Sequence, residues 1–216
     1  MSKLAVFLFD YTGKAAEPFL EAGWDVLCFD IQHGIRKPEL AHGVYCDLST
    51  LGPVLIKLAE RGYTPADIDF LGCFPPCTDV AVCGARDFAT KGLRALQQSV
   101  GFFATSQELA ELTDCPGFIE NPITAMSSHW RKPDHYFHPG DYTGFCLEDN
   151  YTKKTSVWCF GGFVMPQPNR AEGLPDPDDR IHKASPGKGR GDVRSETPRG
   201  FIRAAFQANF EWRQAA

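Results

Sequence analysis

Short apolar runs alternate with helical patterns along most of the chain, and this alternation limits the possible fold more than any other feature. The runs are rich in β-branched and aromatic residues, and we predict strands at residues 4–9, 26–29, 44–46, 68–74, 118–119 and 157–160. Between them we predict helices at residues 17–22 and 53–61 and within 87–112. Strands separated by helices in this way indicate parallel βαβ units. The expected fold class is α/β, with a doubly wound and mostly parallel sheet.

The last quarter of the chain has a different character. Residues 161–199 are rich in proline, glycine and charged side chains and show little periodicity, which predicts a loop. Thr197 and Pro198 then predict a helix N-cap and a proline in the first turn. An amphipathic helix is expected over residues 199–213, and we expect it to pack back on the core.

Composition excludes several classes of protein. With 43% hydrophobic and 12% aromatic residues, the chain can bury a core, which excludes a disordered, collagen-like or coiled-coil protein. No apolar run approaches the roughly 18 residues of a membrane helix, and the first residues lack the pattern of a signal peptide. The eight cysteines are too sparse for a disulfide scaffold, and most lie in apolar runs. We therefore expect a cytoplasmic protein.

Three acidic residues follow the first three predicted strands. Ligands bind at the carboxyl ends of the strands in doubly wound sheets, so these positions are candidates for a site. Asp10 opens a turn in which Gly13 allows the backbone to approach a ligand closely. Asp30 stands about 20 residues further on, where a carboxylate can accept hydrogen bonds from a ribose, and Asp47 follows the third strand. The pattern predicts a nucleoside-bearing cofactor, and an ordinary turn between strand and helix is the alternative.

Cys77 and Glu120 follow the next two strands. Two prolines precede Cys77, and we predict that it lies at or near a helix N-terminus, where the dipole favours a thiolate nucleophile. If the two strands are neighbours, Glu120 lies beside the Cys77 loop. A thiolate next to a partly buried carboxyl group forms a nucleophile and general-acid pair. The alternatives are a cysteine in an ordinary Pro-Pro turn and a glutamate that caps the next turn.

Potential metal ligands also occur after the fifth strand. Their spacing matches no common structural zinc site, and loop residues among prolines and aromatics are the simpler interpretation. We therefore predict no metal at His129, His135, His138 and Cys146.

In this order the motifs resemble those of the DNA (cytosine-5)-methyltransferases, in a short form of the kind that phages and prophages carry. The specific part is Phe74-Pro75-Pro76-Cys77 together with Glu120-Asn121-Pro122. The other motifs, spread over roughly residues 4–210, are Leu8-Phe9-Asp10-Tyr11-Thr12-Gly13, Asp30, Asp47, Lys153-Lys154-Thr155-Ser156-Val157-Trp158 and Arg194-Ser195-Glu196-Thr197-Pro198-Arg199-Gly200-Phe201. The resemblance implies a Rossmann-like S-adenosylmethionine-dependent methyltransferase fold without a full target-recognition domain.

The resemblance also implies a reaction, the transfer of a methyl group from S-adenosylmethionine to C5 of cytosine in DNA. Cys77 would attack C6 of a base flipped out of the duplex, Glu120 would bind the N3 edge, and Asn121 would help to fix the Cys77 loop. Lys153 and Lys154 are the nearest candidates for the arginine pair with which the family assists the base. The implied cofactor-binding residues are Phe9, Asp10, Tyr11, Thr12, Gly13, Asp30, Ile31, Asp47 and Pro75.

The chain departs from the family pattern at three places. Tyr11 stands where family members usually carry a second glycine, and the two lysines lack the guanidinium fork of arginine. Residues 165–192 are too few to build a recognition domain with its own core. We therefore divide the chain into a catalytic core (1–163), a loop in place of a recognition domain (164–196) and a C-terminal helix (197–216), and expect sequence specificity to be short, loose, partner-supplied or absent.

Charge is unevenly distributed along the chain. Residues 1–150 carry 11 Lys and Arg and 20 Asp and Glu, a net charge of −9, whereas residues 151–216 carry 11 and 7, a net charge of +4. We expect DNA to run along the basic segment, with phosphate contacts from Lys153, Lys154, Lys188, Arg190 and Arg194. Two alternatives stay open, the same chemistry on a free pyrimidine nucleotide and a non-catalytic binding protein on the same fold. For a phage-encoded protein the expected location is the cytoplasm of the bacterial host.

Overall fold

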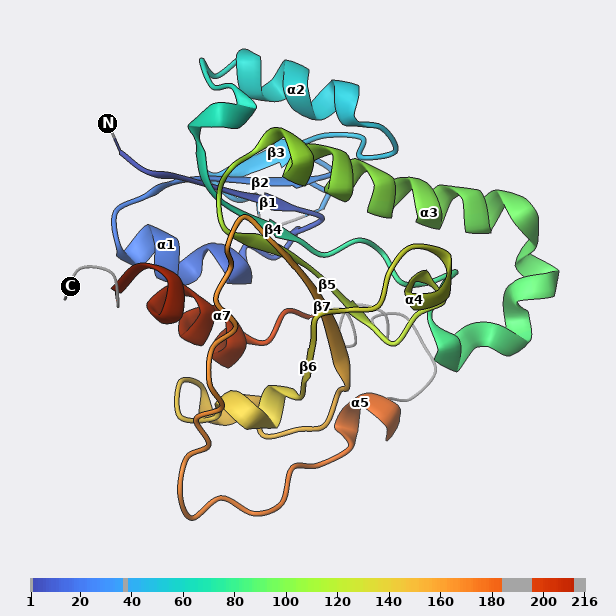
Figure 1. Ribbon diagram of the computed structural model, residues 1–216, viewed down its shortest axis with the longest axis vertical. Coiled ribbons are helices and arrows are strands. Elements are labelled where there is room, and N and C mark those ends of the chain that lie inside the picture. The colour runs from blue at the N-terminus through green and yellow to red at the C-terminus, as the bar shows by residue number, and fades with distance from the viewer. Residues whose placement is uncertain (1, 37–38, 184–195, 212–216) are drawn as a thin grey trace.

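The computed structural model describes residues 2–36, 39–183 and 196–211, which form a seven-stranded sheet between two layers of helices (Figure 1). The strands are β1 (Leu4–Leu8), β2 (Asp25–Asp30), β3 (Gly43–Tyr45), β4 (Ile68–Cys73), β5 (Gly117–Pro122), β6 (His135–Phe137) and β7 (Thr155–Phe160). Their order is β3-β2-β1-β4-β5-β7-β6. The first five pair in parallel, and β7 is antiparallel to both β5 and β6. The predicted α/β class with a mostly parallel sheet is confirmed.

Helices cover both faces of this sheet. They are α1 (Glu17–Glu21), α2 (Leu51–Ala59), α3 (Phe88–Leu112), α4 (Met126–His129), α5 (Arg180–Lys183) and α7 (Arg199–Phe206). One face packs against α2 and α3, and the opposite face packs against α1 and α7 (Figure 1). Among the described residues, no helix is both long enough and apolar enough to cross a membrane.

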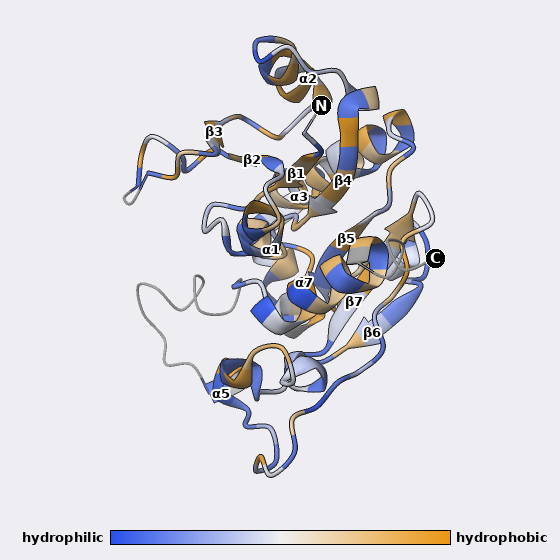
Figure 2. Cartoon of the chain, turned by 90° about the vertical axis from the view of Figure 1, so that its left-hand side faces the viewer, coloured by the Kyte–Doolittle hydropathy of each residue, from blue (hydrophilic) through white to orange (hydrophobic). Residues whose placement is uncertain are grey.

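The first strand explains why continuous apolar runs mark the strands of this chain. Every residue of β1 is buried, because helices cover the sheet on both sides. Successive side chains enter different cores. Leu4, Val6 and Leu8 pack toward α2 and α3, whereas Ala5 and Phe7 pack toward α1 and α7. Figure 2 shows the resulting concentration of hydrophobic residues in β1 and β4.

Some boundaries differ from the sequence-based prediction. Helix α2 begins at Leu51, so that Pro53 is its third residue, and Pro198 rather than Thr197 occupies the N-cap position of α7. Strand β6 was missed, because two of its three residues, His135 and Tyr136, are exposed, so no apolar run marks the strand. The described part of the predicted 161–199 loop is irregular except for α5.

The C-terminal helix is present as far as the structure describes it. Helix α7 buries Phe201 and Ile202 against the sheet, as predicted, and continues into a π-helical turn over Gln207–Glu211. The rest of the predicted helix, residues 212–213, lies outside the described residues.

The strand order reverses between the neighbouring strands β1 and β4. After β1 the chain continues to β2 on one side, and after β4 it continues to β5 on the other side. Beyond the strands, Phe74 N donates a hydrogen bond to Leu8 O at 3.0 Å, and Phe9 N donates to Phe29 O at 2.8 Å. Ligands of doubly wound sheets bind at such a topological switch point. The turns that follow β1 and β4 therefore flank the position at which this fold binds a ligand.

Candidate active site

Cys77 lies in a tight turn after β4, and the chain that follows β5 holds this turn in place. The carbonyl oxygen of Cys77 accepts hydrogen bonds from Val80 N at 3.2 Å and Ala81 N at 2.8 Å. Further along, Val82 N donates to Ile123 O at 3.0 Å. Cys77 is half-buried, so part of it is exposed at the carboxyl edge of the sheet, next to the end of β5.

The prediction that Cys77 lies at or near a helix N-terminus is wrong. The next helical residues form a 3-10 segment at Val82–Asp87, and α3 begins only at Phe88. The turn does not extend into a helix, because Ala81 forms an antiparallel bridge with Thr124 instead. The thiol is therefore positioned by a single turn and by its contacts with the β5 side.

Glu120 is a buried acid at the carboxyl end of β5, the strand next to β4. Only 5% of its surface is exposed, and its Oε1 has no hydrogen-bond partner within the described chain. The Nζ atom of Lys153, a residue that is only 6% exposed, lies 4.0 Å from this oxygen. Burial raises the pKa of Glu120, and the Lys153 ammonium partly counteracts this effect. The carboxyl group therefore keeps its proton to a higher pH than an exposed glutamate does.

Asn121 connects the strand of Glu120 to the turn of Cys77. Its Nδ2 donates a hydrogen bond to the carbonyl oxygen of Pro75 at 2.5 Å, and only 2% of Asn121 is exposed. Pro75, a predicted cofactor contact, is itself buried, and it precedes Cys77 by two residues. The bond therefore fixes the start of the Cys77 turn relative to Glu120.

If Cys77 carries the transfer reaction that the resemblance implies, Asn121→Ala should lower both the stability and the activity of the protein. The variant leaves the buried Pro75 carbonyl without its donor, which costs about 1–3 kcal/mol, and frees the Cys77 turn. Asn150→Ala is a matched control, because Asn150 Nδ2 donates to the Pro175 carbonyl at 3.1 Å away from the site. Urea unfolding should show a loss for both variants, while only Asn121→Ala should lose activity beyond its loss of folded protein. Equal activities in the two variants would contradict the positioning role.

Asp10 shapes the turn that follows β1. Its carboxylate is 3% exposed and accepts hydrogen bonds from Gly13 N at 2.8 Å and Thr12 Oγ1 at 3.0 Å. Burial raises the pKa of Asp10, and these hydrogen bonds oppose the shift. Phe9, just before it, has a φ of 62°, the only positive value for a non-glycine residue in the described chain. Strained backbone conformations of this kind are common at functional sites. The Asp10 carboxylate, by contrast, stabilises the turn through its hydrogen bonds to Thr12 and Gly13.

The ends of β2 and β3 bring the other predicted cofactor residues to the same edge. Asp30 is 7% exposed, accepts a hydrogen bond from Gln32 N at 2.7 Å, and has a pKa raised by burial. Ile31 beside it is 49% exposed and offers an apolar surface. Asp47 is exposed and accepts hydrogen bonds from the hydroxyl and backbone N–H of Ser49, which lower its pKa. A buried carboxylate therefore stands next to an exposed apolar side chain.

Tyr11 extends the turn toward the loop after β2. Its ring centroid lies 5.6 Å from that of His33, and the Arg36 guanidinium carbon lies 4.9 Å from the Tyr11 centroid. His33 is 4% exposed, and its Nε2 lies 3.3 Å from the carbonyl oxygen of Asp10. The position of His33 could not be predicted, because no motif in the sequence distinguishes it from other loop histidines.

If the turn after β1 binds the S-adenosylmethionine that the resemblance implies, Gly13→Ala should weaken this binding. Gly13 has a φ of 67°, and an added Cβ would lie 2.7 Å from Leu40 Cδ1 and 2.8 Å from His42 Nε2. Gly62→Ala is a matched control, because Gly62 has a φ of 80° but nothing within 4 Å of the added Cβ. The shared backbone strain should destabilise both variants by about 1–3 kcal/mol. Calorimetric titration with S-adenosylmethionine should detect weaker binding for Gly13→Ala alone, and unchanged binding would contradict the turn's role.

The structure does not bring all the predicted residues together. Lys154 is exposed, and its Nζ lies over the ring of Tyr136 at 4.9 Å instead of approaching Glu120. The proposed phosphate contacts Lys188, Arg190 and Arg194 lie outside the described residues.

Glu196 connects the turn after β1 with Lys153, the cation beside Glu120, a role that was not predicted from the sequence. Its carboxylate pairs with Lys14, the residue after Gly13, and its carbonyl oxygen accepts a hydrogen bond from Lys153 Nζ at 3.4 Å. The segment before α7 therefore contacts both the turn after β1 and the cation beside Glu120. No sequence signal identifies this contact, because Lys14 and Glu196 are 182 residues apart.

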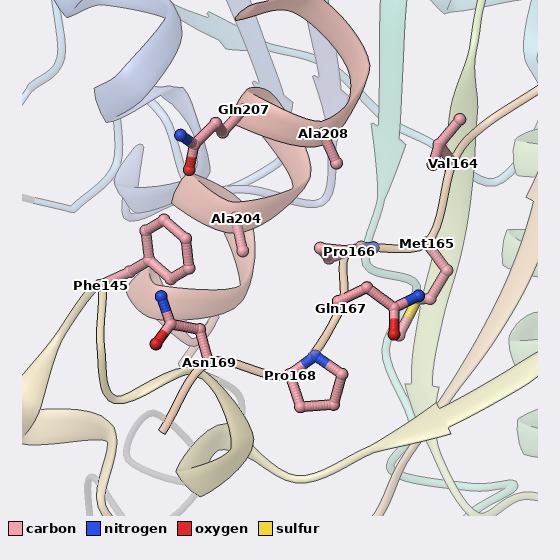
Figure 3. Close-up of a pocket in the computed structure, with 10 residues that line it drawn as sticks. All are labelled: Phe145, Val164, Met165, Pro166, Gln167, Pro168, Asn169, Ala204, Gln207 and Ala208. Atoms are coloured by element: carbon pink, nitrogen blue, oxygen red, sulfur yellow. The ribbon is translucent and has the colours of Figure 1, made fainter. Parts of the chain in front are cut away.

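No family model matches the chain, and a comparison with curated proteins finds no match either. A separate cavity of about 610 Å³ lies between the end of α7 and residues 164–169 (Figure 3). Its lining includes Phe145, Ala204 and Gln207 and none of the predicted site residues, so it is distinct from the candidate site.

Proposed function

We propose that this protein transfers a methyl group from S-adenosylmethionine to C5 of cytosine in DNA. The observation that carries the proposal is that Asn121 ties the start of the Cys77 turn to the end of β5, the strand that carries the buried, incompletely hydrogen-bonded carboxyl group of Glu120, next to the switch point of the sheet. The resemblance to the DNA (cytosine-5)-methyltransferases assigns the same two residues to the reaction. The sheet is compatible with the Rossmann-like fold that this resemblance implies.

Cys77 supplies the nucleophile in this proposal. Its thiolate attacks C6 of the cytosine, so that an S–C6 bond forms and the π electrons of the C5=C6 bond move to C5. C5 would take the methyl group of S-adenosylmethionine, whose S–CH3 bond breaks so that S-adenosylhomocysteine leaves. C5 would then lose its proton to water. The electron pair of the broken C5–H bond restores the C5=C6 bond, the S–C6 bond breaks, and the Cys77 thiolate is regenerated.

Glu120 donates a proton to the cytosine ring and later takes it back. During the attack it donates its proton to N3, which neutralises the charge that develops on the base. Lys153, 4.0 Å away, stabilises the carboxylate that is left, and the proton returns to Glu120 when the S–C6 bond breaks. These two demands suit an acid whose pKa is raised by burial and restrained by a neighbouring cation.

The residues after β1 and β2 fit S-adenosylmethionine, which supplies an electrophilic methyl group when bound. Asp30 would accept hydrogen bonds from the ribose hydroxyls, and the exposed face of Ile31 would contact the adenine. Asp47 would accept a hydrogen bond from the adenine amino group. The turn that Asp10 organises would hold the methionine part.

Nucleoside mass spectrometry of DNA from cells that express the protein tests this proposal. We expect a C5-modified cytosine that is absent from cells carrying the empty vector, and its mass identifies the transferred group. Unmodified DNA from cells that contain the folded protein would contradict the assignment of DNA as the substrate.

A free pyrimidine nucleotide is the second candidate substrate. It is favoured by the irregular described chain between β7 and α5, which forms no recognition domain, and by the net charge of −9 on residues 1–150. Salt dependence separates the two substrates. Binding of DNA through several phosphates weakens steeply as salt concentration rises, whereas binding of a single nucleotide weakens little.

A further inference from the structure

An exposed aromatic side chain and an exposed cation form a pair at the edge of the sheet. Tyr136, in β6, is 49% exposed, and the Nζ atom of Lys154 lies 4.9 Å from the centroid of its ring. Strand β6 is the outermost strand on this side of the sheet (Figures 1 and 2). The cation–π contact holds the two side chains together at the surface.

The strand register places this pair at the same edge as the candidate site. Thr155 is opposite both Pro122, the last residue of β5, and Phe137, the last residue of β6. Lys154 therefore lies beyond the carboxyl end of β5, close to the level at which Ile123 binds the Cys77 turn.

The pair also lies on the side of the sheet to which the Cys77 turn belongs. Tyr136 is opposite Ser156, and the next residue of β7 with the same orientation is Trp158. Trp158 packs in one core with Val80 of the Cys77 turn. A strand of nucleic acid that crosses this edge can therefore contact both the pair and the Cys77 turn, while Glu120, opposite Val157, faces the other side of the sheet.

The charge of Lys154 is not neutralised within the described chain. Arg131, Lys91 and Arg180 each form an ion pair with an aspartate, whereas Lys154 has no acidic partner among the described residues. An uncompensated lysine on a body of net negative charge favours an anionic partner. The adjacent ring favours a partner with a planar group, and a DNA strand combines phosphates with stacking bases.

We propose that Tyr136 and Lys154 form a docking subsite for the DNA strand that carries the target cytosine. Tyr136 stacks against a base that neighbours the target, and Lys154 contacts a phosphate of the same strand. This inference rests on the proposed function for the choice of DNA. The subsite supplies strand contacts from β6 and from the residue just before β7, and the described part of residues 164–196 forms no recognition domain.

Fluorescence anisotropy with a short, labelled single-stranded DNA, measured without cofactor over a range of salt concentrations, tests the subsite. Tyr136→Ala should weaken binding about tenfold, within the range expected when one base loses an aromatic partner. Tyr136→Phe should bind like the wild type, because it keeps the ring. Lys154→Ala should weaken binding and reduce the slope of log Kd against log salt concentration by about 0.7, the value for one phosphate contact on a single strand.

Matched controls are available at the opposite edge of the sheet and beside it. Tyr45 is 53% exposed on β3, and Lys57 lies on α2, so Tyr45→Ala and Lys57→Ala remove the same residue types elsewhere. Both should bind the oligonucleotide like the wild type. Circular dichroism melting of all the variants distinguishes a lost contact from a lost fold.

The outcomes separate this inference from the proposed function. If Tyr136→Ala and Lys154→Ala bind like the controls, or if the folded wild-type protein binds no oligonucleotide at low salt, the inference is overturned. If the two variants lose binding as described while the wild-type protein transfers no methyl group to DNA, the subsite stands and the proposed function fails. If the wild type modifies DNA and the variants are unaffected in binding, the function stands and the subsite fails.

Discussion

Cys77→Ala is expected to lower the rate of methyl transfer by about 10⁴-fold or more, while the fold and cofactor binding survive. Alanine cannot form the S–C6 bond, so C5 never becomes nucleophilic. The contacts that hold the turn are made by backbone atoms of Cys77, Val80 and Ala81 and by Asn121, all of which the variant keeps. Transfer of labelled methyl groups to DNA by the purified variant measures the loss, and thermal unfolding with and without S-adenosylmethionine measures what survives.

Cys146→Ala is the matched control for this variant. Cys146 is also half-buried, and its Sγ contacts Glu148 rather than any residue of the candidate site. It should keep full activity. A DNA that contains 5-fluorocytosine provides a second readout, because fluorine at C5 prevents the proton loss that releases Cys77. We expect a covalent protein–DNA complex with the wild type and with Cys146→Ala and none with Cys77→Ala, and activity retained in Cys77→Ala would refute the mechanism.

Glu120→Gln is expected to lower the rate of transfer by about 10²- to 10⁴-fold and to change its pH dependence. Glutamine can still hydrogen-bond the base, but it cannot donate a proton to N3. With the wild type, activity should fall as the pH rises through the raised pKa of Glu120, because the acid loses the proton it must donate. Glu120→Gln should lack this alkaline limb.

Lys153→Met tests the cause of the pKa. The Lys153 ammonium lowers the pKa of Glu120, against the larger effect of burial, so its removal should raise this pKa further. The alkaline limb of the pH–rate profile should therefore move to higher pH. Lys154→Met is the matched control, because Lys154 is exposed and lies over Tyr136, and it should leave the limb in place. A limb that moves to lower pH in Lys153→Met would contradict the assignment of Glu120 as the general acid.

The same buried acid makes stability depend on pH. Because burial raises the pKa of Glu120 above its ordinary value of 4.5, the folded chain binds more protons than the unfolded chain between the two values. The free energy of unfolding therefore falls as the pH rises through this window. Glu120→Gln removes this pH dependence. The free energy of unfolding of Glu120→Gln should therefore rise relative to that of the wild type as the pH rises through the same window. Urea unfolding at several pH values measures the difference.

Much of the sheet could be predicted because its strands are buried on both faces. The runs at β1, β2 and β4 read as continuous apolar segments, and their predicted ends lie within one residue of the observed ones. The strand and helix alternation also led to the parallel pairing of the first five strands. The antiparallel direction of β7 did not follow from that rule. Strand β6 was missed because His135 and Tyr136 are exposed and no apolar run marks the strand.

The residues after the strands were found for a physical reason as well. The carboxyl ends of parallel strands lie at one edge of the sheet, so Cys77, Glu120 and Asp30 were expected along that edge. Their environments did not follow from the sequence. Only the folded chain shows that the Asp10 carboxylate accepts hydrogen bonds from its own turn. The folded chain also shows that Cys77 lies in a single turn and not at the start of a helix.

The α/β class, most of the strands and the residues that follow them could be predicted from the amino-acid sequence, because burial patterns along the chain and strand direction fix these features. The tertiary structure alone decided that Lys153 faces Glu120 while Lys154 faces Tyr136, and that Glu196 contacts both Lys14 and Lys153. Adjacent residues on an extended chain point to opposite sides, and partners 182 residues apart meet only when the last helix packs back on the sheet.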